Sequence, residues 1–299
     1  MNFTIASTLD EALAALANGA RPIAGGSDLV VGARHGKAPM PDSVVAIDRI
    51  DSLGHIEASA GGVRIGALVS HARLEVDDEI VGRYTGLADA SALVGSPATR
   101  NVGTLGGNVM NASPAMDTGA PLLVLGAEIE LQSTTGARRI PVDELWTGPG
   151  RTSATPSELC VAVHLPTRPA KSGSAYVRLE YRRAMEIAVV GAAASVQLDE
   201  AGGLAALSVA LTAVAPTIIA VNGTDTLLGR QVDDALLAEI ANLAAEQASP
   251  ISDVRASDGY RRHCVGVMAR RAVDAAARRA RGESIAVPVN RSLGIGAAS

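Results

Sequence analysis

The chain is poor in aromatic residues and in cysteine. Aromatic residues make up 2% of its 299 residues, with Trp146 and Phe3 as the single members of their types. A base-stacking platform needs several aromatic side chains, so we expect none here. Cys160 and Cys264 have no neighbouring Cys or His at ligand spacing. This argues against a disulfide framework and a four-cysteine iron–sulfur cluster, and we expect two buried thiols.

Long apolar runs and an excess of positive charge are also missing. No basic segment precedes an apolar run near residue 1, and no stretch reaches about eighteen uninterrupted apolar residues. We therefore expect no transmembrane segment and a cytoplasmic protein. A net charge of −5 and a pI near 5.6 argue against nucleic acid as the main partner. We expect no metal site, since metal-ligand spacing is absent around the histidines His35, His55, His71, His164 and His263.

Two glycine-rich segments are the most informative feature. Residues 22–29 and 104–117 each contain a Gly-Gly pair beside a hydroxyl residue, with an Asx residue following. Glycine tolerates the positive φ angles of a concave nest, in which successive backbone N–H groups converge on an anion. Two such nests suit the linked phosphates of a dinucleotide, held without a Rossmann fingerprint. The alternatives are a tight turn after a strand at Gly25-Gly26 and a structural loop at 106–108.

The hydrophobic pattern divides the chain near residue 170. Thr8 and Glu11 form a capping box before a helix over residues 9–18. Strands are predicted at 21–24, 44–47, 62–68 and 158–165, and a hairpin at 128–141. A Pro- and Gly-rich break at 166–173 is followed by three antiparallel strands at 174–181, 188–198 and 204–211, then helices at 233–247 and 259–281. We expect two α+β domains and a loose tail after residue 285.

Five blocks of the chain resemble, in order and spacing, the FAD-binding medium subunit of the molybdenum hydroxylases, the family of xanthine dehydrogenase and carbon monoxide dehydrogenase. The blocks are residues 24–29 (AGGSDL), 99–108 (TRNVGTLGGN), 112–117 (ASPAMD), 183–190 (RAMEIAVV) and 253–257 (DVRAS), the last followed by Tyr260 and Arg261. The resemblance implies a two-lobed FAD-binding domain of the PCMH (vanillyl-alcohol-oxidase-like) type over residues 1–170. A CO-dehydrogenase-type C-terminal domain, with a three-stranded sheet packed on helices, would cover residues 171–285, and residues 286–299 would be a tail.

The resemblance also implies which residues meet FAD. Both nests would hold its pyrophosphate through backbone amides and hydroxyls. The residues expected to line the cofactor are Ile23, Ala24, Gly25, Gly26, Ser27, Asp28, Thr104, Gly107, Asn108, Met110 and Asn111.

Four further residues are matched singly. Asp117 would accept from ribityl or ribose hydroxyls, with a helix cap as the alternative. Leu159 would lie near the adenine or the flavin. Arg178 would stabilise negative charge on the reduced ring, with a solvated strand residue as the alternative, and Ile187 would lie near the ring face. We interpret Glu186 as a salt-bridge partner of Arg183.

The implied chemistry is electron relay, and no residue of this chain is expected to be catalytic. A large subunit would carry molybdopterin and a small subunit two [2Fe–2S] clusters, in a dimer of heterotrimers. Electrons would pass through FAD to an external acceptor such as NAD⁺, a quinone or oxygen. The alternatives are a self-sufficient flavin oxidase or reductase, and a non-catalytic assembly factor without FAD.

Overall fold

The first of three structural units is a small lobe at the N-terminus. The computed structural model describes residues 2–36, 38–182 and 184–295. A parallel sheet in the order β1-β3-β2 packs against α1. The capping box at Thr8 and Glu11 is confirmed, and Leu13 and Leu16 of α1 are buried with Val45. The elements are β1 (Asn2–Ile5), α1 (Leu9–Ala17), β2 (Arg21–Ile23), α2 (Leu29–Arg34) and β3 (Ser43–Ala46).

The second lobe is an antiparallel sheet in the order β4-β5-β10-β6-β7, with helices on one face. Its strands are β4 (Ile56–Ser59), β5 (Gly62–Gly66), β6 (Glu128–Ser133), β7 (Gly136–Pro141) and β10 (Leu159–Pro166), with a separate ribbon of β8 (Trp146–Gly148) and β9 (Arg151–Thr152). Its helices are the 3₁₀ helix η1 (Asp51–Leu53), α3 (His71–Leu74), α4 (Asp78–Arg83), α5 (Thr85–Leu93), α6 (Pro97–Val102), α7 (Leu105–Asn111), α8 (Gly119–Val124) and α9 (Val142–Leu145). The predicted hairpin is β6–β7.

The C-terminal domain is an antiparallel sheet with two long helices. The three predicted strands are present as β11 (Ser172–Leu179), β12 (Val190–Leu198) and β13 (Leu204–Thr212). The described residues add a fourth, β14 (Ile219–Ala220), so the prediction of a three-stranded sheet was short by one two-residue strand. One face of the sheet is covered by α10 (Asp234–Gln247) and α11 (Asp258–Ala280). The remaining helices are η2 (Thr224–Leu227) and α12 (Val289–Ser292).

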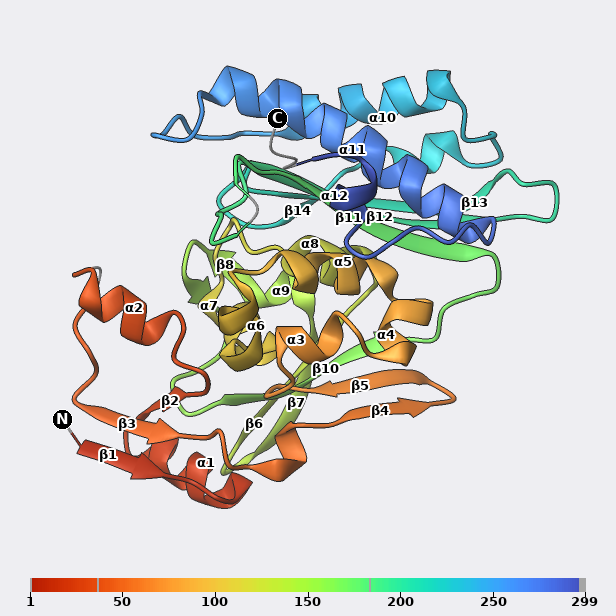
Figure 1. Ribbon diagram of the computed structural model, residues 1–299. Helices are drawn as coiled ribbons and strands as arrows, with labels where there is room; N and C mark the ends of the chain where they lie inside the picture. The colour runs from red at the N-terminus through yellow and green to blue at the C-terminus, as the bar shows by residue number, and fades with distance from the viewer. Residues whose placement is uncertain (1, 37, 183, 296–299) are drawn as a thin grey trace.

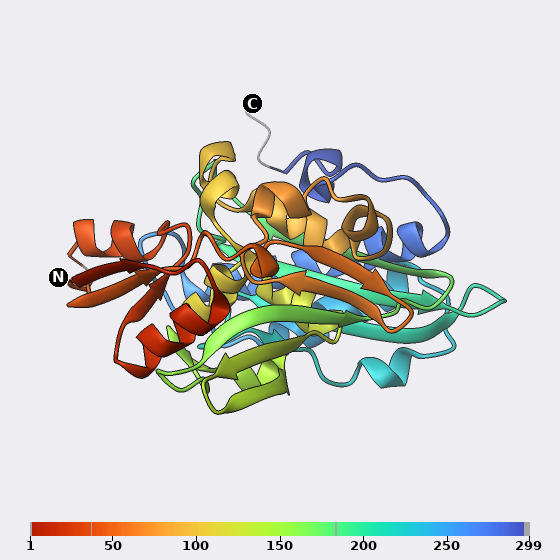
Figure 2. The ribbon, with the colours of Figure 1, turned by 90° about the horizontal axis from the view of Figure 1, so that it is seen from below.

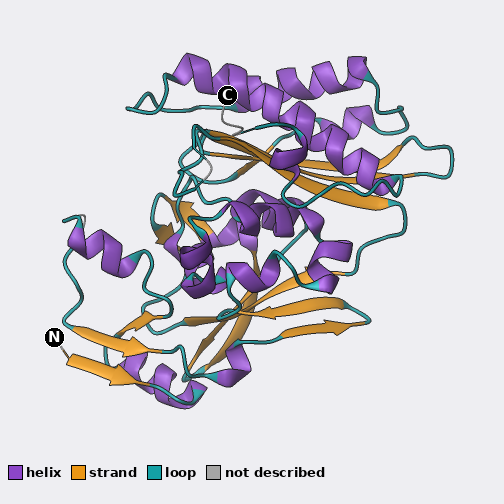
Figure 3. Ribbon diagram, in the orientation of Figure 1, coloured by secondary structure: helices purple, strands orange, loops and turns teal. Residues whose placement is uncertain are grey.

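Helices α5 and α8 lie between the two large sheets. Both contact the strands of the C-terminal sheet, and Figure 3 shows helices and sheets alternating through this part of the molecule. Residues 86–93 of α5 are buried all round, which fits a helix enclosed on both sides. The first lobe projects from one end of this stack (Figure 2). The α+β, two-domain fold class is therefore confirmed.

A single carboxylate joins four parts of this stack. Asp89 of α5 is fully buried, and Arg279 of α11 donates to both of its oxygens over 2.5 and 3.0 Å. The same oxygens accept from the backbone N–H of Tyr176 on β11 and of Val289 in the C-terminal segment. Burial raises the pKa of Asp89, an effect opposed by Arg279 and the two backbone donors.

The C-terminal segment is part of the fold, so the expectation of a loose tail was wrong for its described part. Val289 and Asn290 of α12 are 1% exposed. The Asn290 side chain donates to the carbonyl of Arg178 and accepts from its N–H, over 2.9 and 3.2 Å. This side chain therefore hydrogen-bonds to β11 much as a neighbouring strand would.

Two other expectations concern the whole chain. Cys160 and Cys264 are free and buried, as predicted. Burial, reinforced by Glu130, raises the pKa of Cys160 to about 12, so its thiol stays protonated. Within the described ranges, we find no helix with the length and apolar character that a bilayer span requires.

We expect Asp89→Asn to lower the free energy of unfolding by about 3–5 kcal/mol, because it leaves the Arg279 guanidinium buried without a counter-charge. The measurement is urea unfolding. Asp234→Asn is the control, since its ion pair with Arg270 is exposed and should contribute less than about 1 kcal/mol. Equal losses in the two variants would contradict the role given to Asp89.

Candidate functional site

The two glycine-rich segments meet in the fold although about eighty residues separate them. A Cβ atom on Gly25 would lie 1.7 Å from the carbonyl oxygen of Val102, the last residue of α6. A Cβ on Gly103 would lie 3.6 Å from Ser27 Oγ and 3.3 Å from His71 Cδ2. The first segment therefore packs on the junction between α6 and α7, and only glycine fits at position 25.

The first segment keeps backbone donors available. It connects β2, which ends at Ile23, to α2, which begins at Leu29. Gly26 has φ +67°, in the left-handed region that a concave turn needs. Within the described chain, the N–H groups of Gly25, Gly26 and Ser27 make no hydrogen bond. Three consecutive unpaired donors suit an anion.

The second segment is not a nest, which corrects the sequence prediction. Gly106 and Gly107 lie in α7, and Thr104 is its N-cap. The N–H of Gly107 donates to Thr104 Oγ1 over 3.1 Å, and that of Gly106 to Ala67 O over 2.9 Å. A Cβ on Gly106 would lie 2.6 Å from Ala67 Cβ, so this glycine permits close packing of the helix on the second lobe. The physical reason for the difference is that the Thr104 side chain starts a helix where two glycines indicated a loop.

Four predicted residues nevertheless share one face of α7. Thr104, Gly107, Asn108 and Asn111 are spaced by three or four positions and are all at least partly exposed. Asn108 Oδ1 accepts from Thr118 Oγ1 over 2.6 Å, which fixes its amide. Met110 instead packs against the core of the second lobe. The helix thus presents a polar strip beside the first segment.

A buried charged cluster lies where β11 meets the helix layer. Arg178 is fully buried, and its Nη1 donates to Asp117 Oδ2 over 2.7 Å. Its Nε donates to Glu180 Oε2 over 2.8 Å, and Tyr176 Oη donates to Asp117 Oδ1 over 2.8 Å. The solvated-strand alternative for Arg178 was therefore wrong. So was the helix-cap alternative for Asp117, because the N-cap of α8 is Thr118 and makes no side-chain cap bond.

This cluster is not cationic. It holds two carboxylates and one guanidinium. Burial and the charge of Asp117 raise the pKa of Tyr176, which stays neutral. Burial alone would lower the pKa of Arg178. The effects of Asp117, Tyr176 and Glu180 outweigh burial, so the pKa of Arg178 lies above its ordinary value. The positive charge of Arg178 is thus compensated by the carboxylates of Asp117 and Glu180, which differs from the free cation implied by the resemblance.

The loop after β11 connects this cluster to α6. The N–H of Met185 donates to Gly95 O over 2.8 Å, and Arg178 Nη1 donates to Glu186 O over 3.5 Å. Met185 has φ +55°, an uncommon conformation for a residue with a side chain. Met185 and Ile187 are 56% and 45% exposed. Exposed apolar side chains at this point suit an apolar ring or a partner surface.

Two further predicted assignments concern Leu159 and Glu186. Leu159 is 4% exposed in the core of the first lobe, against which Ala24 of the first glycine-rich segment also packs. The predicted Glu186–Arg183 bridge involves Arg183, which lies outside the described residues. Glu186 has an ion-pair distance of 3.6 Å to Arg182.

Sequence reasoning missed several residues of this region. Tyr176 and Glu180 flank Arg178 at a spacing of two, so a strand pattern could have placed all three on one face. His71, for which the sequence predicted only that it is not a metal ligand, is 1% exposed at the meeting point of the glycine segments. Its Nδ1 is buried without a hydrogen-bond partner. Burial, and then Arg100, lower the pKa of His71 to about 4.

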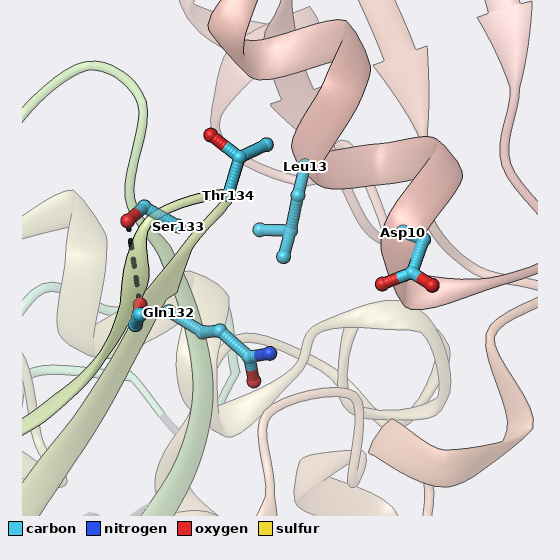
Figure 4. A pocket seen from close by; sticks show the side chains of 6 residues that line it. Asp10, Leu13, Gln132, Ser133 and Thr134 are labelled. Carbon is cyan, nitrogen blue, oxygen red and sulfur yellow. Dashed lines mark hydrogen bonds between the residues drawn. The ribbon is translucent and has the colours of Figure 1, made fainter.

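Two surface hollows lie away from these residues. One, of about 360 Å³, is lined by α1 and the β6–β7 turn, where Leu13 and Asp10 face Gln132 and Thr134 (Figure 4). The other, of about 490 Å³, lies between β14 and the end of α10. Neither hollow includes a residue of the glycine segments.

Gly25→Ala should displace the first segment, because its Cβ cannot coexist with the Val102 carbonyl. We expect faster hydrogen exchange over residues 24–34 and a loss of about 1–3 kcal/mol in unfolding free energy. Gly32→Ala is the matched control, since nothing lies within 4 Å of its Cβ position in α2. That variant should be unchanged or more stable by up to about 1 kcal/mol. Similar behaviour of both variants would contradict the packing of Gly25.

His71 should make stability depend on pH. The unfolded chain binds a proton at a pKa near 6.5, whereas the folded chain does so only near 4. The neutral, buried imidazole therefore contributes about 3 kcal/mol to the free energy of unfolding above pH 6.5. This contribution is lost as the pH falls from 6.5 to about 4. His71→Gln should remove that part of the slope in urea unfolding measured across the range. An unchanged slope would show that the imidazole has the same pKa in the folded and the unfolded chain.

Comparisons with known proteins agree with this architecture. Residues 1–168 match the model of the FAD binding domain in molybdopterin dehydrogenase, and residues 175–276 match the CO dehydrogenase flavoprotein C-terminal domain. The chain is 31% identical to a putative xanthine dehydrogenase FAD-binding subunit of Escherichia coli, over 93% of this chain and 96% of that protein. It is 34% identical to the carbon monoxide dehydrogenase medium chain of Afipia carboxidovorans, over 90% and 93%.

The fold agrees as well. A crystal structure of Cu,Mo-CO dehydrogenase contains a chain that superposes with a TM-score of 0.88 at 31% identity, covering 93% of this chain and 98% of that one. The glycine segments and the two-lobed first domain lie within the matched regions, as does the C-terminal sheet from residue 175 onward. The chain therefore belongs to the family of FAD-binding medium subunits of the molybdenum hydroxylases.

Proposed function

We propose that this chain binds FAD and passes electrons from iron–sulfur clusters of a partner subunit to an external acceptor. One observation carries the proposal: three consecutive backbone donors at residues 25–27, which find no acceptor among the described residues, are held against the α6–α7 junction of an FAD-binding-type domain. Such donors suit a diphosphate. The imidazole of His71, buried at the same place with no hydrogen-bond partner among the described residues, is a second sign that the site accommodates a polar ligand.

The residues present fit FAD in three parts. Residues 23–28 would hold the diphosphate through backbone N–H groups and the Ser27 hydroxyl. The polar strip of α7 would hold hydroxyl and carbonyl groups, through Thr104, Gly107, Asn108 and Asn111. Ile187 would cover apolar parts of the ring, and Asp117 and Arg178 would support the site from beneath it. Met110 would act through the packing of α7, and Leu159 would lie near the adenine or the flavin from the core against which Ala24 packs.

FAD, when bound, supplies the coupling of one-electron donors to two-electron acceptors. The chain's own task is to bind and orient the cofactor. No nucleophile or general base is required of it. The buried cluster holds its protons at fixed atoms: Tyr176 keeps its phenolic proton on Oη, bonded to Asp117. A cluster with more carboxylates than guanidinium groups would disfavour a negative charge placed beside it.

The partners follow from the same proposal. The relatives are a subunit of xanthine dehydrogenase and a medium chain of carbon monoxide dehydrogenase. We propose a large molybdopterin subunit and a small [2Fe–2S] subunit, assembled as a dimer of heterotrimers, with NAD⁺, a quinone or oxygen as acceptor. With two cysteines, both buried and in separate domains, this chain cannot ligate such clusters itself.

The test is the absorption spectrum of the full chain, co-expressed with its partner genes and purified through a tag on it alone. We expect flavin bands, an iron–sulfur contribution and both partners. Gly107→Val should lose the flavin, because a branched side chain would fill the open face of α7 and crowd Thr104 Oγ1. Gly82→Val, on an exposed helix position with open space around it, is the control and should keep the flavin.

Other outcomes would favour the alternatives. Flavin without partners, reduced by a substrate in the chain alone, would indicate a self-sufficient oxidase or reductase. A colourless protein that takes up no FAD would indicate an assembly factor.

A further inference from the structure

His71 lies where the two glycine-rich segments meet. Its backbone N–H donates to Gly103 O over 3.0 Å, which fixes the start of α3 beside α7. Its Cδ2 and the Ser27 hydroxyl both lie within 4 Å of the position that a Cβ on Gly103 would take. The imidazole thus shares one small space with residues 25–27, whose N–H groups make no hydrogen bond within the described chain.

The two ring nitrogens differ in their surroundings. Nδ1 is sealed from solvent and has no hydrogen-bond partner. Nε2 is bonded to the Cδ2 atom that faces Gly103. It makes no hydrogen bond within the described chain either, but unlike Nδ1 it is not completely buried. The Nε2–Cδ2 edge of the ring is therefore the edge that faces the junction of the segments.

The protonation state follows from this asymmetry. Burial and the neighbouring Arg100 lower the pKa of His71 to about 4, so the ring is neutral near pH 7 and carries one N–H. A proton on Nδ1 would be buried without an acceptor. The proton is better placed on Nε2, where the ring offers an uncharged donor to the junction.

We propose that His71 is a cofactor-binding residue, whose Nε2–H donates to a phosphate oxygen of the bound dinucleotide beside the N–H groups of residues 25–27. This inference rests on the proposed function. It gives the imidazole a ligand partner at Nε2, the nitrogen that the described residues leave unbonded on the side of the junction, while Nδ1 stays the unprotonated nitrogen.

The experiment compares FAD affinity in the full chain after the flavin has been removed. His71→Phe keeps a ring of similar size and removes both nitrogens, whereas His71→Gln keeps an N–H donor at nearly the reach of Nε2. We expect FAD binding about tenfold or more weaker in His71→Phe, the scale of one charge-assisted hydrogen bond, and within about threefold of the parent in His71→Gln. Fluorescence titration with FAD measures both.

Two controls separate binding from folding. His164→Phe removes an imidazole that bonds Glu130 on the sheet of the second lobe, and it should bind FAD as the parent does. The melting temperature of flavin-free His71→Phe should equal or exceed that of the parent, because an unpaired buried nitrogen is removed.

Three results would overturn the inference. Parent-like affinity in His71→Phe would show that the nitrogen makes no ligand contact. Equal losses in the Phe and Gln variants would assign His71 a packing role alone. A parent chain that takes up no FAD would overturn the proposed function itself, and this inference with it.

Discussion

The arrangement of the whole molecule depends on the buried carboxylate of Asp89. It lies in a helix enclosed between two sheets, where an unpaired charge would be very costly. Its four donors come from Arg279, the β11 backbone and the C-terminal segment. Because these four hydrogen bonds meet at one carboxylate, they fix β11, α11 and the segment at α12 relative to the first domain. Because Arg178 is on β11, the same interaction sets the position of the charged cluster against the glycine segments.

The candidate site is built on this frame from three segments that are distant in sequence. The absence of a side chain at Gly25 lets residues 23–28 pack on α6, and its absence at Gly106 lets α7 pack on the second lobe. The loop after β11 completes the surface through the hydrogen bond from Met185 to Gly95. Packing of backbone on backbone, rather than charge, thus brings the parts together, and the unpaired donors remain for a ligand.

Local signals in the sequence predicted the parts of this structure that local physics determines. The Thr8–Glu11 capping box, the β6–β7 hairpin and the three long strands of the second domain were all confirmed. The helix at residues 105–111 was missed because the Gly-Gly pair outweighed the Thr104 cap. The pairing of Arg178 with Asp117 and the docking of Asn290 on β11 join segments about sixty and more than a hundred residues apart, and no local pattern reports them.

The most direct test of the central claim is hydrogen–deuterium exchange of the full chain with and without FAD. The claim is that one ligand is held jointly by the first glycine segment, the α6–α7 region and the loop after β11. We expect protection on FAD addition in residues 24–29, 97–111 and 178–187 together. Protection confined to one of these segments, or centred on the groove between α1 and the β6–β7 turn, would contradict the account.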